Sequence, residues 1–345
     1  MYQSFDDRRK FPATSTFSPV RRQLLGAGLL ATIVLAPTQP VFAHGGNGGR
    51  ASDYRIEVTG FHGDPSGIEM RPVELGNRME LVRTTAKEVQ ILGYSGEPYL
   101  RLAADGVFEN TNSPAHYLNL DRFARTPIPP TASATAAPHW VKLSDGTSIR
   151  WHDHRTHWMD TTPRQDVRDD PGVERVISNE PVALVVDGRS VSAIVKVTWL
   201  PPPPRLTWLV ITSLAGCVLL AAFVLVPTLR RFAPECVVLA SLGCLVGSGG
   251  SKFRNVASGL MLVLALVGWI IKNRWLPVAA ATVVVVLAVT HFEVFEHRLL
   301  AGWAPAGLQR LGVTVALALA AAVVGAELVA GLGATAPVQP AAVEP

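Results

Sequence analysis

Cysteine is scarce in this 345-residue chain, and its three copies are confined to one part of it. Cys217, Cys236 and Cys244 all lie in or beside long apolar runs, whereas residues 44–204 contain no cysteine. This stretch therefore has no disulfide and no thiolate to bind zinc or an iron–sulfur cluster. Any metal site within it has to use His, Asp, Glu or Met side chains.

The common catalytic signatures are also missing. The sequence has no Gly-rich phosphate loop, no H-E-x-x-H, no nucleophile elbow and no Cys/His arrangement. A copper oxidase with a histidine brace would use the same ligands as a simple copper-binding protein, so enzymatic activity stays undecided. The sequence favours a protein that is not an enzyme.

The first 43 residues have the pattern of an export signal. A polar and basic start is followed by a largely apolar stretch at 24–36 and by the small-residue cleavage pattern Val41-Phe42-Ala43. The Arg21-Arg22 pair resembles a twin-arginine signal, and general secretion is the alternative. Cleavage after Ala43 would leave His44 as the new N-terminus.

A second boundary lies at Pro201–Pro204, which form a stiff spacer. The sequence beyond it predicts a helical membrane domain over 205–333 and a disordered tail over 334–345. The second of the five predicted spans ends in a Gly-rich stretch, and a re-entrant segment is the alternative there. The predicted spans are Leu206–Val226, Glu235–Gly250, Val256–Ile271, Leu276–Phe292 and Leu311–Gly333.

Positive charges flanking the spans predict the orientation. Arg230 and Arg231 follow the first span, and Lys272 and Arg274 follow the third, so both loops are expected in the cytoplasm. We therefore expect a multi-pass plasma-membrane protein whose domain at 44–204 is extracytoplasmic and whose tail is cytoplasmic. The pI of about 9.1 reflects the leader and these flanks, which favours contact with anionic lipid and gives no reason to expect nucleic acid.

The domain at 44–204 is predicted to be all-β. Val191 to Trp199 alternate apolar and polar residues, and Asp187-Gly188 joins them to the run Val182–Val186 as a hairpin turn. Many short strands around one core favour an immunoglobulin-like or cupredoxin-like β-sandwich. The other predicted strands are Tyr54–Thr59, Arg78–Arg83, Glu88–Tyr94, Tyr99–Leu102, Trp140–Leu143 and Ser148–His152.

The segment Trp151–Met159 is the densest cluster of metal-binding side chains. On a strand His152 and His154 would project from one face, and His157 and Met159 follow closely. Imidazole and thioether ligands without a competing thiolate predict a transition-metal site, for which copper is the favoured ion.

The same segment also has a purely structural interpretation. Asp153 could pair with Arg150 or Arg155, the histidines could form hydrogen bonds across a sheet edge, and Trp158 and Met159 could belong to the core. The sequence leaves both interpretations open.

His44 is a further candidate ligand. Its α-amine and imidazole can together chelate Cu(II), and His152 or His154 could complete the set of nitrogen ligands. The alternative is that His44 merely begins a disordered terminus.

Three segments resemble an uncharacterised group of actinobacterial membrane proteins: 106–115, the Trp-His-Asp-His-Arg-x-His-Trp-Met motif at 151–159, and Val197-Thr198-Trp199. This resemblance implies a membrane topology and leaves the activity open. His44 after Val41-Phe42-Ala43 is similar to the mature start of exported copper proteins of the CopC and YcnI kinds, which implies a β-sandwich with an N-terminal copper ligand. In this chain the glycine-rich residues 45–49 follow that histidine.

Two functions from different classes follow. The first is a membrane-anchored extracytoplasmic protein that binds or senses a metal ion, copper above all. The second is a non-enzymatic cell-envelope module whose β-sandwich binds a protein partner. The lipid bilayer is a partner in both cases.

Overall fold

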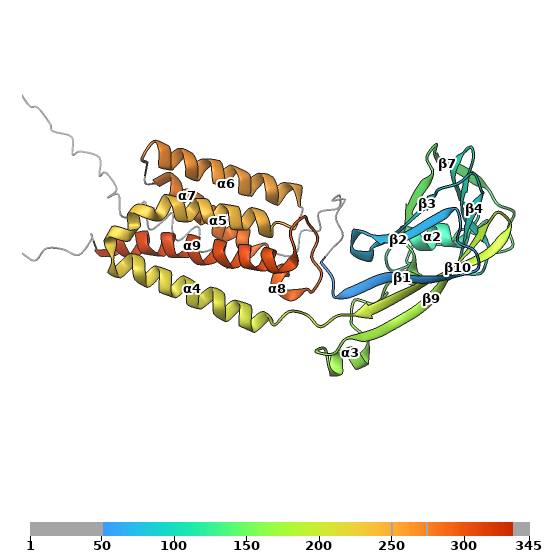
Figure 1. The fold of residues 1–345 in the computed structure, drawn as a ribbon, viewed down its shortest axis with the longest axis horizontal. Helices are drawn as coiled ribbons and strands as arrows, with labels where there is room; N and C mark the ends of the chain where they lie inside the picture. Colours follow the sequence, from blue (N-terminus) through green and yellow to red (C-terminus); the bar gives the residue numbers. More distant parts are fainter. Residues whose placement is uncertain (1–50, 250, 274, 334–345) are drawn as a thin grey trace, which may run out of the picture. The chain divides into compact units, whose positions relative to one another are not determined.

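A computed structural model describes residues 51–249, 251–273 and 275–333. A β-sheet region over residues 54–199 is followed by a helical part, in which four helices are long and apolar enough to cross a membrane (Figure 1). The predicted leader, His44 and the predicted tail at 334–345 lie outside the described residues.

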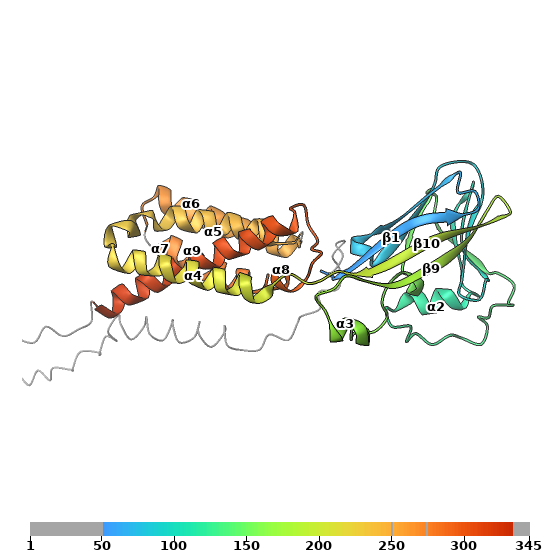
Figure 2. The ribbon, with the colours of Figure 1, turned by 60° about the horizontal axis from the view of Figure 1, so that its bottom comes forward.

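The β region contains two antiparallel sheets, which Figure 2 shows from a second side. The larger sheet has the order β1-β10-β9-β4-β5-β6-β7, and the smaller one has the order β2-β3-β8. Short helices α2 (Pro114–Leu120) and α3 (Gln165–Asp169) lie in the connections. The strands are β1 (Tyr54–His62), β2 (Ile68–Val73), β3 (Arg78–Arg83), β4 (Val89–Leu92), β5 (Pro98–Ala103), β6 (Gly106–Asn110), β7 (Trp140–Ser144), β8 (Ser148–Trp151), β9 (Arg175–Val186) and β10 (Arg189–Trp199).

The predicted hairpin is confirmed by strands β9 and β10. Asp187 and Gly188 have φ angles of 51° and 75°, the two positive values that a type I′ turn requires. Along β10 the residues Val191, Ala193, Val195 and Val197 are buried, as the alternation predicts. The other six predicted strands also coincide with observed ones, whereas β2 and β6 were not predicted.

Both sheets contribute to one hydrophobic core. Met79 and Leu81 of β3 are completely buried together with Leu102 of β5 and Val195 of β10. Met79 therefore fills space in the core.

The segment 106–115 holds the larger sheet and helix α2 together. The Asn110 side chain donates a hydrogen bond to the Pro98 carbonyl at 2.7 Å. Ser113 caps the N-terminus of α2 and donates from its hydroxyl to the Glu97 carboxylate at 3.0 Å. These contacts fix the position of helix α2 beside strands β5 and β6.

The helical part begins directly after Pro201–Pro204, and each predicted apolar run coincides with a helix. Helix α5 is not among the four candidate spans. Its 15 residues reach about 22 Å, which is less than the roughly 30 Å of a bilayer core, whereas α7 has the same length but its candidate span continues through α8 to Glu296. The count of five spans therefore stays a prediction. The helices are α4 (Arg205–Leu225), α5 (Ala233–Gly247), α6 (Lys252–Ile270), α7 (Trp275–Val289), α8 (Glu293–Glu296) and α9 (Ala306–Gly333).

Helices α5 and α9 approach closely through a pair of glycines. A Cβ atom at Gly312 would lie 2.6 Å from the Gly243 carbonyl oxygen, and a Cβ at Gly243 would meet the backbone of Gly312. Any larger residue would force the two backbones apart. Small residues allow the same close approach in other contacts between membrane helices.

Glu293 and His297, four residues apart, do not share one helical face. Helix α8 ends at Glu296, and His297 adopts an extended conformation. Glu293 forms an ion pair with Arg254 at 2.8 Å, while His297 Nδ1 lies 3.0 Å from the Asp53 carboxylate. The hydrogen bond to Asp53 raises the pKa of His297.

Candidate metal centre

Strand β8 and the turn that follows it position the three histidines of the Trp151–Met159 segment. The strand ends at Trp151, one residue earlier than predicted, and His154–Thr156 form the short 3₁₀ helix η2. His152 and His154 therefore do not project from one face of a strand, and that expectation is wrong. Asp153 begins η2 by accepting a hydrogen bond from the Arg155 backbone N–H at 3.1 Å.

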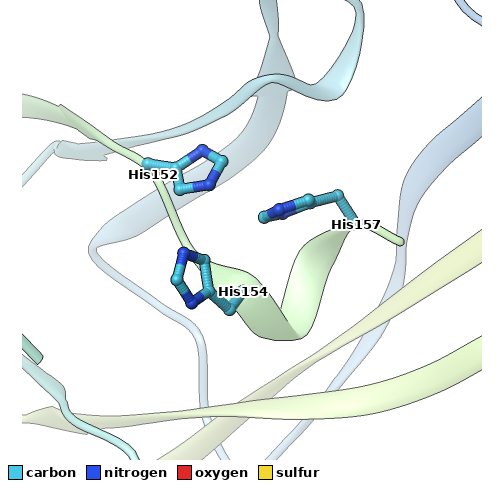
Figure 3. Close-up of side chains that lie close together, drawn as sticks. All are labelled: His152, His154 and His157. Atoms are coloured by element: carbon cyan, nitrogen blue, oxygen red, sulfur yellow. The ribbon is translucent and has the colours of Figure 1, made fainter. Parts of the chain in front are cut away.

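The turn nevertheless brings the three imidazoles together (Figure 3). Ring centroids are 4.3 Å apart for His152 and His157, 5.1 Å for His152 and His154, and 5.5 Å for His154 and His157. One nitrogen of each ring can be chosen so that all three lie within 4.8 Å of one another. In a tetrahedral site with metal–nitrogen bonds of about 2.0 Å, such nitrogens are about 3.3 Å apart, so small ring rotations would close the site.

Each imidazole is oriented by a hydrogen bond to a backbone carbonyl. His152 Nδ1 lies 2.9 Å from the Asn77 oxygen, His154 Nε2 lies 3.0 Å from the Asp121 oxygen, and His157 Nδ1 lies 2.9 Å from the Asp153 oxygen. A carbonyl only accepts, so each of these ring nitrogens carries the proton. The opposite nitrogen of each neutral ring then presents a lone pair.

Two of these lone pairs belong to buried atoms. Nε2 of His152 and Nε2 of His157 have no hydrogen-bond partner among the residues that the structure describes. A buried polar atom without a partner is costly, and a metal ion would satisfy both atoms at once.

Burial keeps the imidazoles neutral. Desolvation lowers the pKa of His152 and of His154, and it lowers the pKa of His157 to about 3. Neutral imidazole is the form that binds metal, so little proton competition is expected near neutral pH.

Asp153 organises the turn that carries the histidines. Its fully buried carboxylate accepts hydrogen bonds from Trp151 Nε1 at 3.0 Å and from the Arg155 guanidinium at 2.7 Å. Burial alone would raise the pKa of Asp153, but the hydrogen bonds and charge of Arg155 outweigh this effect and hold the pKa below its usual value. Of the two partners expected for Asp153, Arg155 is therefore the one present, and Arg150 pairs with Glu80.

Tyr94 connects the turn to the larger sheet. Its hydroxyl accepts a hydrogen bond from the His154 backbone N–H at 3.0 Å and also bonds Asn119. The Arg155 guanidinium lies over the Tyr94 ring at 5.0 Å. Sequence reasoning missed Tyr94 and Asn119, because nothing in their local sequence indicates their proximity to the histidines.

The two other predicted ligands, Met159 and His44, do not belong to the group of three histidines in the part of the chain that the structure describes. Met159 is partly buried and lines a cavity of about 350 Å³ with Phe123, Arg125, Asp160 and Thr161. The group of converging ligand atoms consists of the three histidines. His44 lies outside the described residues, so its participation stays a prediction.

No family model, curated protein or solved structure matches this chain. The resemblances inferred from the sequence therefore stay predictions, and the functional argument rests on the geometry of the histidine cluster.

Proposed function

We propose that the β region binds one transition-metal ion through His152 Nε2, His154 Nδ1 and His157 Nε2. The observation that carries this proposal is the proximity of three imidazoles, each oriented by a hydrogen bond to a backbone carbonyl, with one nitrogen of each ring within 4.8 Å of the others. Hydrogen bonding of the second ring nitrogen to a carbonyl is the usual support of a metal-binding histidine.

Copper is the ion that we propose for this site. Imidazole suits copper, zinc and nickel, and among divalent ions of the first transition row Cu(II) binds nitrogen ligands most tightly. Three protein ligands leave room for a fourth, and His44 and Met159 are the candidates. A retained open position would instead allow an exchangeable ligand, as a protein that delivers or senses copper requires.

The proposed protein is anchored in the plasma membrane, with its β region outside the cytoplasm. The export signal at 1–43 and the positive residues after helices α4 and α6 support this orientation. We further propose that the two sheets form a β-sandwich of the immunoglobulin-like or cupredoxin-like kind, because both contribute residues to one core.

Copper titration of the full-length protein in detergent tests the metal proposal. After removal of bound metal, we expect one Cu(II) per chain, an EPR spectrum split by nitrogen ligands, and weaker binding of Zn(II) and Ni(II). The double variant His152→Ala, His154→Ala is expected to lose this binding. His62→Ala, which changes an exposed histidine of the same β region, is the matched control.

A folded double variant that binds copper as the wild type does would make the cluster structural. The second candidate function, recognition of a protein partner, would then take first place. Strand β7 favours it, because this strand lies at the edge of the larger sheet and exposes Val141 and Leu143. An unpaired edge of this kind can accept a strand from another protein.

A further inference from the structure

A second cavity lies among the helices, far along the chain from the histidines. It has a volume of about 350 Å³ and is lined by Arg230 and Arg231 of the 3₁₀ helix η3 (Pro227–Phe232), by Lys272 and Asn273 after α6, and by Glu327 of α9. Apolar lining comes from Ala233, Pro277 and Val278. Segments from four parts of the helical region therefore form this basic pocket.

The charge balance of the basic pocket is positive. The lining residues include two arginines, one lysine and one carboxylate, that of Glu327, so their formal charge is 3 − 1 = +2. Local contacts hold both arginines, because Arg230 Nε donates to the Phe223 carbonyl at 2.9 Å and the Arg231 guanidinium lies over the Phe232 ring at 4.7 Å. Lys272 follows α6 in the left-handed region, with a φ of 54°.

The basic pocket lies where candidate spans end. Helix η3 follows α4, and Lys272 follows α6, so these cations mark the same boundary of two candidate membrane helices. Trp269, which is about half exposed, also lines the pocket, and its Nε1 donates to the Glu235 carboxylate at 3.1 Å. Tryptophan is enriched where a membrane helix meets the lipid head groups.

We propose that the basic pocket binds the phosphate head group of an anionic phospholipid. The cations provide charge-assisted donors for the phosphate, and Pro277 and Val278 at the start of α7 provide apolar surface beside it. Cationic pockets between membrane helices suit anionic lipid head groups for this reason. A soluble phosphate would use the same cations and leave this apolar surface unused. The inference does not depend on metal binding.

Native mass spectrometry of the delipidated full-length protein tests this proposal. We expect phosphatidylglycerol to bind more tightly than phosphatidylcholine. The double variant Arg231→Gln, Lys272→Gln is expected to bind phosphatidylglycerol more than tenfold less tightly, since one cation near a membrane surface contributes about fivefold. Lys252→Gln, which removes an exposed cation at the first residue of α6, is the matched control and is expected to bind as the wild type does.

Three results would overturn the proposal. The first is equal binding of the two lipids by the wild type. The second is phosphatidylglycerol binding by the folded double variant at the level of the Lys252→Gln control, with folding checked by thermal unfolding in detergent. The third is displacement of the lipid by equimolar glycerol phosphate, which would identify a soluble phosphate as the occupant.

Discussion

Acidification is expected to open the histidine cluster of the metal-free protein. The pKa of His157 is about 3 in the folded chain, whereas an unfolded imidazole has a pKa of about 6.5. The folded cluster thus binds fewer protons than the open one, and its stability rises with pH. The stabilisation is present above about pH 6.5 and is lost progressively as the pH falls toward the folded pKa near 3.

The size of the effect follows from this difference in pKa. Between about pH 7 and pH 5, protonation of His157 in the open form alone favours opening by about 2 kcal/mol, which is a roughly thirtyfold change in the opening equilibrium. The pKa values of His152 and His154 are lowered as well, so they act in the same direction. Asp153 stays ionised over this range because its pKa lies below the usual value.

Hydrogen exchange of the full-length protein in detergent measures this opening. The backbone amides of 154–157 are expected to lose protection about thirtyfold between pH 7 and pH 5, after correction for the intrinsic exchange rate. His157→Asn removes one of the titrating groups and should weaken the dependence, while His62→Asn should keep it. Equal protection at the two pH values in the wild type would refute the reasoning, because it would mean that the rings are not desolvated.

Two substitutions probe the packing that supports the two parts of the molecule. Asp153→Asn leaves the largely buried Arg155 without its carboxylate, so we expect about 3 kcal/mol of destabilisation and a 10- to 100-fold loss of copper affinity, measured by melting and titration. An unchanged affinity would show that Asp153 does not position the ligands. Gly243→Ala should destabilise the protein by about 1–3 kcal/mol because its Cβ meets the Gly312 backbone, whereas Gly259→Ala, with open space around its Cβ, should be neutral or stabilising. Equal melting temperatures of the two alanine variants would contradict the close contact of α5 and α9.

The sequence predicts the elements whose hydrophobic pattern is long or regular. Strand β10 and the apolar helices belong to this class, because burial of one face or of a whole span leaves a repeated signal. Strand β2 was missed because its short sequence contains Pro72. Proline is tolerated there because β2 forms the edge of the smaller sheet, and edge position is a property of the fold that the local sequence does not reveal.

The histidine cluster was predicted from the correct residues by a wrong geometric argument. The H-x-H spacing of His152 and His154 was interpreted as one face of a strand, but the chain leaves the sheet after Trp151. Asp153 explains the difference, because its side chain caps η2 and its backbone carbonyl accepts from the His157 ring. An Asp between two histidines therefore favours a turn, which brings His157 to the other two rings.

The orientation of the three imidazole rings depends on backbone carbonyl groups, which the sequence does not reveal because every residue has one. The carbonyls of Asn77 and Asp121 reach the cluster from positions 75 and 33 residues distant from their histidines, and neither interaction uses the Asn or Asp side chain. A search of the sequence for further polar side chains near the histidines therefore cannot find them. What the sequence can supply is the set of ring nitrogens, and the fold decides which nitrogen of each ring keeps its proton. Because three carbonyls fix that choice before any ion binds, the metal that we propose would bind without a change of tautomer.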